Sequence, residues 1–177
     1  GGLVADCKGE NAPQSPAGLY SVGTDDPLAL DKFEILEGAT LSYNNWCDVD
    51  RSLKTLTAIS AGLKNLNKEN SKIIIGVKHG NPCGVGANDD AKEATKLMVE
   101  GDPLSLFGGL VISNFPITKD EAELLIKHEV GEAPKRIIDA VVAPSFSDEA
   151  MEILRRKNGA CRFLKNEALG DERLRPT

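Results

Sequence analysis

The sequence of 177 residues lacks three features that would each indicate a particular class of protein. It has no apolar run of the roughly 18 residues that cross a bilayer, and its opening residues lack the charged-then-apolar order of a signal peptide. Its four cysteines are too far apart to supply the close pairs of ligands that structural zinc sites use, which favours free thiols in a reducing compartment. Lys and Arg number 21 against 27 Asp and Glu, a net charge of −6, so no surface for coating nucleic acid is expected. We therefore expect a cytoplasmic protein that binds neither membranes nor nucleic acid.

The remaining composition, 41% hydrophobic and 27% charged residues, is typical of a globular domain large enough to bury its own core. Residues 1–31 are rich in Gly, Pro, Ser and Asp, which predicts an extended or looped arm. The domain proper is expected over residues 32–165. Residues 166–177 are expected to form a tail or a linker to a further segment.

Between these limits, strand-like and helix-like patterns alternate. Buried apolar runs predict strands at residues 73–77, 110–113 and 137–143, with shorter ones at 33–36, at a sheet edge, and 161–164. Amphipathic spacing and capping signals predict helices at about 48–66, 89–100, 118–128 and 147–159. The alternation predicts a layered α/β domain with a mixed or mostly parallel sheet. Because ligands collect at the carboxyl ends of strands in such sheets, the loops after Val77 and Ala143 are the first places to look for a site.

The segment 78–86 carries the strongest chemical signal, because it places a cation, an imidazole, an amide and a proline turn directly after a buried strand. Lys78 is suited to stabilising an oxyanion, and His79 to moving a proton near neutral pH. The alternative is a solvated turn with an incidental histidine. His128, near the end of a charged helix, fits better as a surface residue that interacts with the helix dipole.

Two further segments have weaker signals. The paired glycines in residues 102–109 allow the backbone to approach a ligand closely, although a tight turn with Phe107 in the core explains them as well. The dipeptide Pro82-Cys83 is reminiscent of zinc deaminases, but their signature needs a second cysteine at position 86, which is glycine here, and an H-x-E motif that the chain lacks. Dinucleotide and phosphate-loop glycine motifs are also incomplete or missing.

Taken in order, several segments resemble the formyltransferase domain of the AICAR transformylase/IMP cyclohydrolase family. Residues 78–84 match its K-H-x-N-P-C-G stretch, and residues 102–109 match D-P-x-S-x-F-G-G. Residues 41–45 match L-S-Y-N-N, and residues 139–144 are similar to a strand that ends in I-A-P with a nearby Asp. Residues 8–14 resemble a degraded form of the arm motif R-Y-G-x-N-P-H-Q.

This resemblance implies a cytidine-deaminase-like α/β/α fold without zinc, in a homodimer. It also implies a reaction of purine biosynthesis, in which 10-formyltetrahydrofolate as co-substrate passes its formyl group to the 5-amino group of AICAR and so gives FAICAR. The catalytic roles then fall on Lys78 and His79, and no metal ion is expected. The substrate-binding positions that match the family are Lys8, Asn45, Asn81, Ser105, Phe107, Gly108 and Asp139.

The chain departs from the family pattern in two ways. In the arm, Cys7-Lys8 stands where the family has Arg-Tyr, and Pro13 stands where it has His; a lysine lacks the planar fork with which arginine grips a phosphate. The chain also resembles only the first of the two related halves of the family's domain. We therefore keep three alternatives: a piece of a longer formyltransferase that is weakly active or inactive alone, a non-catalytic module that binds a purine nucleotide or oligomerises, and a relative of the deaminases.

Overall fold

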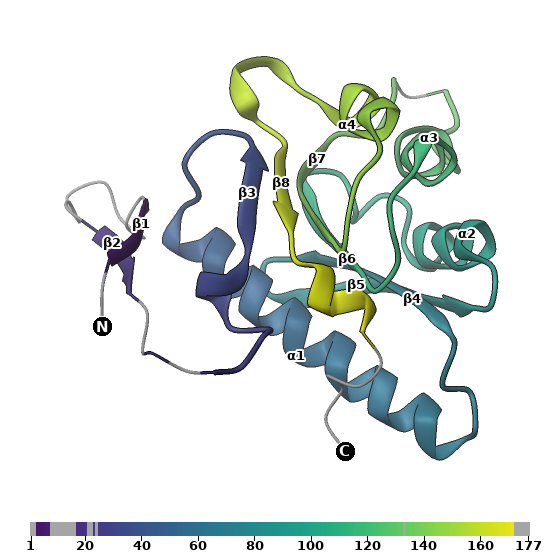
Figure 1. The fold of residues 1–177 in the computed structure, drawn as a ribbon. Helices are drawn as coiled ribbons and strands as arrows, with labels where there is room; N and C mark the ends of the chain where they lie inside the picture. The colour runs from purple at the N-terminus through teal and green to yellow at the C-terminus, as the bar shows by residue number, and fades with distance from the viewer. Residues whose placement is uncertain (1–2, 8–16, 21–22, 24, 133, 172–177) are drawn as a thin grey trace.

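The computed structural model describes residues 3–7, 17–20, 23, 25–132 and 134–171. None of the helices in this part of the chain is both long and apolar enough to span a bilayer. In chain order (Figure 1), the elements are β1 (Leu3–Cys7), β2 (Ala17–Tyr20), η1 (Leu30–Lys32), β3 (Glu34–Glu37), α1 (Tyr43–Asn65), β4 (Lys72–Lys78), β5 (Asn81–Asn88), α2 (Ala91–Gly101), β6 (Gly109–Ser113), α3 (Lys119–Lys127), β7 (Ile138–Ala143), α4 (Asp148–Leu154), η2 (Lys157–Gly159), β8 (Arg162–Lys165) and η3 (Glu167–Gly170).

Six strands form one mixed sheet in the order β3-β8-β7-β6-β4-β5. The central pairs β6–β7 and β7–β8 are parallel, whereas β3–β8, β6–β4 and β4–β5 are antiparallel. The prediction of a mixed sheet is confirmed, with β3 at its edge as expected. β1 and β2 pair with each other in a separate antiparallel sheet.

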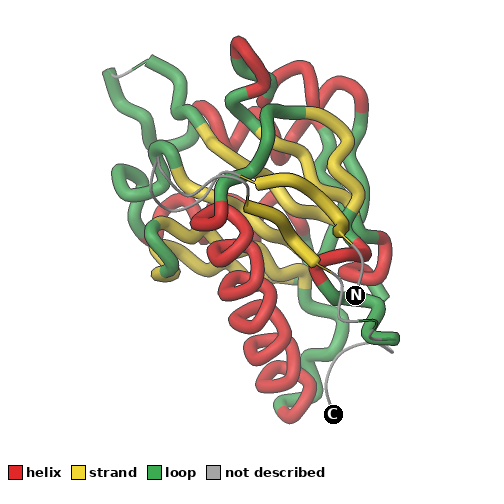
Figure 2. The backbone as a smooth tube through the Cα atoms, turned by 90° about the vertical axis from the view of Figure 1, so that its left-hand side faces the viewer, coloured by secondary structure: helices red, strands yellow, loops and turns green. Residues whose placement is uncertain are grey.

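Helices cover both faces of the sheet, which confirms the three-layer α/β/α arrangement. Figure 2 shows the long helix α1 crossing one face, with the other helices behind the strands. β4 is buried on both sides: Ile73 and Ile75 belong to the core under α1 with Trp46, and Ile74 belongs to the core under α2, α3 and α4 with Met98. This alternation explains why residues 73–77 form an unbroken apolar run.

The sequence patterns located most elements within two residues of their observed ends. The capping box predicted for α3 is present, with the Thr118 amide donating to Glu121 Oε2 at 3.1 Å and the hydroxyl contacting the same oxygen. Ser147 caps α4 by accepting the N–H of Ala150 at 3.1 Å. Each cap satisfies amide donors that the first turn of a helix leaves free.

The prediction that α1 begins near residue 48 is wrong, because the helix already begins at Tyr43. Ser42 and Asn45 form a capping box: the Asn45 amide donates to Ser42 Oγ at 3.1 Å, and Asn45 Oδ1 accepts the Ser42 amide at 3.0 Å. The polar stretch before the apolar spacing is therefore the cap and first turn of the helix itself.

The segment 78–86 is not a loop but the turn and most of the second strand of a β-hairpin. β4 and β5 are joined by His79 and Gly80, whose φ angles of 52° and 77° are those of a two-residue turn with both central residues left-handed. Gly84 and Gly86 allow β5 to lie against the backbone of α2. With glycine and proline at so many positions, β5 lacks the alternation by which strands are recognised.

The last helix is also shorter than predicted, since α4 ends at Leu154 rather than near Gly159. Arg155 leaves the helix with ψ of 142°, and its guanidinium contacts the Glu37 carboxylate on β3 at 2.5 and 2.9 Å. Arg155 and Arg156 therefore follow the helix, and their ion pairs with Glu37 and Asp139 connect it to the sheet.

Candidate functional site

The end of the sheet where β4 finishes is also where β6 and β7 begin. β4 runs antiparallel to β6, and β6 runs parallel to β7. The loops after Val77 and Ala143, the first places in which a site was expected, therefore lie at opposite ends of the sheet. The mixed order instead brings together four predicted site residues at what we call the Lys78 edge: Lys78, Phe107, Gly108 and Asp139.

Lys78, the last residue of β4, is fixed at this edge by a backbone partner. Its half-buried side chain reaches across to β6, where Nζ donates to the carbonyl oxygen of Phe107 at 2.6 Å. An ammonium group has three donors, so two remain for a ligand. The lysine is thus a positioned cation rather than a freely moving surface side chain.

Gly108 and Asp139 lie side by side at the starts of β6 and β7. The Gly108 amide donates to Ile137 O at 2.9 Å, and a Cβ on Gly108 would lie 3.8 Å from Asp139 Oδ2. The φ of Gly108 is 70°, a conformation that favours glycine. The Asp139 carboxylate is paired with Arg156 at 2.5 Å. Arg156 therefore adds a second cation to the edge.

His79 is exposed at the tip of the hairpin, directly beside Lys78. Gly80, the next residue, lies against Arg51 of α1. A Cβ on Gly80 would lie 2.0 Å from the guanidinium nitrogen Nη1 of Arg51. Any larger residue at position 80 would displace Arg51. The turn therefore presents the imidazole outward while its glycine packs against α1.

Asp48, one helical turn before Arg51, joins the hairpin to α1. The carboxylate accepts the backbone N–H of Gly80 and lies close enough to His79 and Arg51 to interact with their charges. Burial raises the pKa of the Asp48 carboxyl above its usual range, and those three neighbours oppose the shift. A partly buried carboxylate next to an imidazole is the arrangement that orients histidines in many enzymes.

A buried arginine fixes the position of the segment that precedes β6. Arg136, 1% exposed, donates to Pro103 O at 3.2 Å, Leu125 O at 2.8 Å and His128 O at 2.9 Å. Its guanidinium lies 5.3 Å from the centre of the Phe107 ring. Burial lowers the pKa of Arg136. This single cation holds the chain that carries the Phe107 carbonyl.

The other predicted binding residues take less direct positions. Ser105 is engaged with Asp102, whose carboxylate accepts its amide at 3.1 Å and its hydroxyl at 2.5 Å. Exposed Asn81 donates to His79 O at 3.3 Å, and Asn45 serves in the cap of α1. Lys8 falls outside the described residues.

A cavity of about 370 Å³ lies beside the N-terminal half of α1. Arg51 lines it and at the same time packs on the hairpin turn, so the cavity and the turn share this cation. Buried Trp46 Nε1 has no hydrogen-bond partner within the part of the chain that is described. The lining residues are Gly18, Leu19, Leu30, Tyr43, Trp46, Cys47, Asp50 and Arg51.

Cys83, on β5 near the Lys78 edge, is poorly suited to nucleophilic chemistry. Burial, and then the charge of Asp102, raise the pKa of its thiol. A thiol held protonated is a weak nucleophile and a weak metal ligand.

Asp48, Arg51 and Arg156 complete the site but carried no recognisable signal in the sequence. Arg156 follows a helix end, where basic residues are ordinary, and the pairing with Asp139 depends on the order of β7 and α4 in space. The arrangement combines the exposed imidazole of His79 with three cations, Lys78, Arg51 and Arg156. Lys78 is held by a backbone carbonyl. Such a set can bind an anionic ligand and move a proton at its reacting group.

Comparisons with known proteins show the family to which the chain is similar. The family model described as AICARFT/IMPCHase bienzyme matches residues 7–175. The chain is 37% identical over 149 residues to the bifunctional purine biosynthesis protein PurH of Bacillus cereus, and 38% identical over 149 residues to that of Bacillus mycoides. Each alignment covers 84% of this chain and 25% of the relative, so the chain spans about a quarter of the length of the curated relatives it matches.

Proposed function

Because the chain belongs to the AICARFT/IMPCHase bienzyme family, we propose that it carries the first half of an AICAR formyltransferase site that acts in purine biosynthesis. The observation that supports the proposal is that Lys78 lies with Phe107, Gly108 and Asp139 at one edge of the sheet, with His79 next to it in the hairpin turn. The cyclohydrolase activity has no comparable support, since the family stretches matched at this edge resemble the formyltransferase domain.

In this proposal the 5-amino nitrogen of AICAR attacks the formyl carbon of 10-formyltetrahydrofolate. A new N–C bond forms, the bond from N10 to the formyl carbon breaks, and the proton lost by the amine ends on N10. His79 accepts that proton as a general base and then donates it to N10, so that the imidazole is neutral again at the end of the reaction. Lys78, with two ammonium donors free of Phe107, stabilises the negative charge that develops on the formyl oxygen.

We assign the grip on the nucleotide phosphate to Arg51, which supplies the planar fork that the arm lacks at position 7, where cysteine stands in place of the family's arginine. The guanidinium lines the 370 Å³ cavity and reaches the turn that presents His79. Arg51→Ala is expected to raise the KM for AICAR at least tenfold with a smaller change in kcat, because a phosphate contact is made equally in ground and transition states. A change in kcat alone would contradict the assignment.

The role of His79 is tested with His79→Asn, because asparagine tolerates the left-handed conformation of the turn but cannot transfer a proton. Formyl transfer by the longest polypeptide that contains this chain should fall about 100-fold or more. Lys72→Ala, at the far end of the same strand as Lys78, is the control and should leave the rate unchanged. Equal rates for wild type and His79→Asn would remove the catalytic role.

The chain by itself is expected to be weakly active or inactive, because His79 is exposed and a formyl-transfer site must hold two substrates in register. Calorimetric titration with AICAR and with folate separates the alternatives. Binding of AICAR without turnover in the longest polypeptide would favour the non-catalytic nucleotide-binding module. Binding of neither ligand would leave an oligomerising role.

A further inference from the structure

A second group of chemically active side chains lies away from the Lys78 edge, where α2 and α3 end. Among the residues that the structure describes, Glu100, His128 and Glu129 form the group in which three possible metal-ligand atoms lie within 4.8 Å of one another. His128 Nε2 is 2.8 Å from Glu100 Oε1. One imidazole and two carboxylates therefore converge from the last turn of α2 and from the two residues that follow α3.

The spacing of these atoms suits a small divalent ion. Zinc binds imidazole nitrogen and carboxylate oxygen at about 2.0–2.2 Å, which in a tetrahedron puts ligand atoms roughly 3.3 Å apart. His128 Nε2 and Glu100 Oε1 are 2.8 Å apart, and all three ligand atoms lie within 4.8 Å of one another, limits that include that value.

Both helices direct their negative ends toward this group. Glu100 is the last but one residue of α2, and His128 is the C-cap of α3. The free carbonyls at a helix C-terminus carry partial negative charge and favour a cation. Arg136 holds the His128 carbonyl at 2.9 Å and so fixes the backbone that carries the imidazole.

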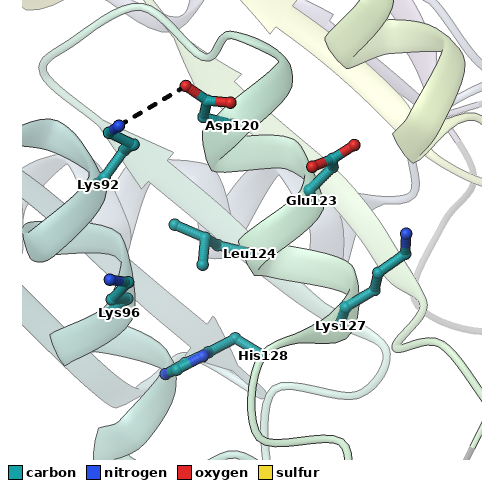
Figure 3. A pocket seen from close by; sticks show the side chains of 7 residues that line it. All are labelled: Lys92, Lys96, Asp120, Glu123, Leu124, Lys127 and His128. Carbon is teal, nitrogen blue, oxygen red and sulfur yellow. Dashed lines mark ion pairs between the residues drawn. The ribbon is translucent and has the colours of Figure 1, made fainter.

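Figure 3 shows the imidazole of His128 directed toward α2, at one end of a cavity of about 440 Å³ between α2 and α3. The nearby lysines are oriented so that they repel a bound cation only weakly. Lys92 is 3.9 Å from Asp120, Lys96 is 3.0 Å from Glu93, and Lys127 points away from the imidazole. The cavity leaves room for water or a small anion as a fourth ligand.

We propose that Glu100, His128 and Glu129 bind a divalent transition-metal ion of the zinc type, which links the C-terminal ends of α2 and α3. The imidazole ligand favours zinc over magnesium, which prefers oxygen donors alone. The ion stabilises the packing of α2 against α3 and leaves one coordination position open toward the cavity.

The test is calorimetric titration of the metal-free chain with zinc chloride, alongside His128→Ala. Zinc bound at any other place on the chain is common to both proteins, so the site appears as one binding event present in wild type and absent in His128→Ala. Glu129→Gln should weaken that event at least tenfold. Glu123→Gln removes an equal charge from the wall of the same cavity without removing a ligand, and should weaken it less than twofold.

Thermal unfolding gives an independent reading. At free zinc about 100 times the dissociation constant, the Tm of wild type should rise by about 5–11 °C. The Tm of His128→Ala should show no rise that comes from this site. Equal zinc binding by wild type and His128→Ala would overturn the proposal. Equal weakening by Glu123→Gln and Glu129→Gln would do so too, because it would show only general attraction to an acidic surface. Neither result depends on formyl transfer, so the proposed function stands or fails separately.

Discussion

The close contact between β5 and α2 predicts opposite effects for the same substitution at two glycines. A Cβ on Gly86 would lie 1.8 Å from the carbonyl oxygen of Ala94, and real Cβ atoms essentially never lie closer than 3.0 Å to another heavy atom. Gly86→Ala must therefore push the α2 backbone away by about 1.2 Å, the difference between the two distances. Gly62, exposed in α1, has nothing within 4 Å of its Cβ position.

The displaced helix contributes buried residues to the core, among them Ala94 and Met98 at 0% and 1% exposed. Overpacking of this kind costs about 2–3 kcal/mol, which lowers the Tm of a domain of this size by about 4–12 °C. Gly62→Ala should instead raise the free energy of unfolding by about 0.5–1 kcal/mol, because alanine is the better helix former.

Urea unfolding followed by circular dichroism gives both differences in the free energy of unfolding. The slope m is measured for each variant, and a shared value is used only where the slopes agree. The decisive quantity is the difference between the two variants, since both replace glycine by alanine. If Gly86→Ala is as stable as wild type, the packing argument is refuted, because β5 and α2 would then not be in contact through backbone atoms.

Three more predictions follow from individual groups. Arg136→Met leaves one buried and two partly buried carbonyl oxygens without their donor and should lower the free energy of unfolding by about 3 kcal/mol in urea titrations, whereas a loss below 1 kcal/mol would contradict the role of this anchor. Burial raises the pKa of the Cys161 thiol to about 12, so iodoacetamide at pH 8 should leave Cys161 unmodified in the folded chain and modify it in urea, as read by mass spectrometry. Because burial raises the pKa of Asp48, the folded state holds the proton of this carboxyl to higher pH than the unfolded state does, and the stability that the group contributes is lost as pH rises between the two pKa values. Asp48→Asn should therefore raise the Tm at pH 7 and remove this pH dependence. A decrease in Tm at pH 7 would contradict the sign of the effect.

The parts of the fold that the sequence predicts are those specified by local patterns. The unbroken apolar run at residues 73–77 predicts a strand buried on both faces, and the capping residues Thr118 and Ser147 predict the starts of α3 and α4. β5 escapes prediction because its glycines are selected by contact with α2 rather than by a period along the strand. The start of α1 is missed for a similar reason, since Asn45 acts through its cap geometry and not through hydrophobic spacing.

The candidate site divides in the same way. Lys78 and His79 stand out because they are unusual residues directly after a buried strand. Asp48, Arg51 and Arg156 reach them only through the tertiary fold, and each is of a residue type that is common at helix ends. No local pattern reports which strands run antiparallel, so the sequence could not show that the amino ends of β6 and β7 would meet the end of β4.

That strand order has a consequence for how the site is built. In a wholly parallel sheet, the residues beside Lys78 would come from loops that follow strands. Here they come from the segment that precedes β6, and its position is set by Arg136, which binds Pro103 O and packs on the Phe107 ring. The same guanidinium binds the carbonyl of His128. One buried arginine therefore supports both the Phe107 carbonyl that holds Lys78 and the backbone of the proposed metal ligand, so the two sites share a support although they share no ligand.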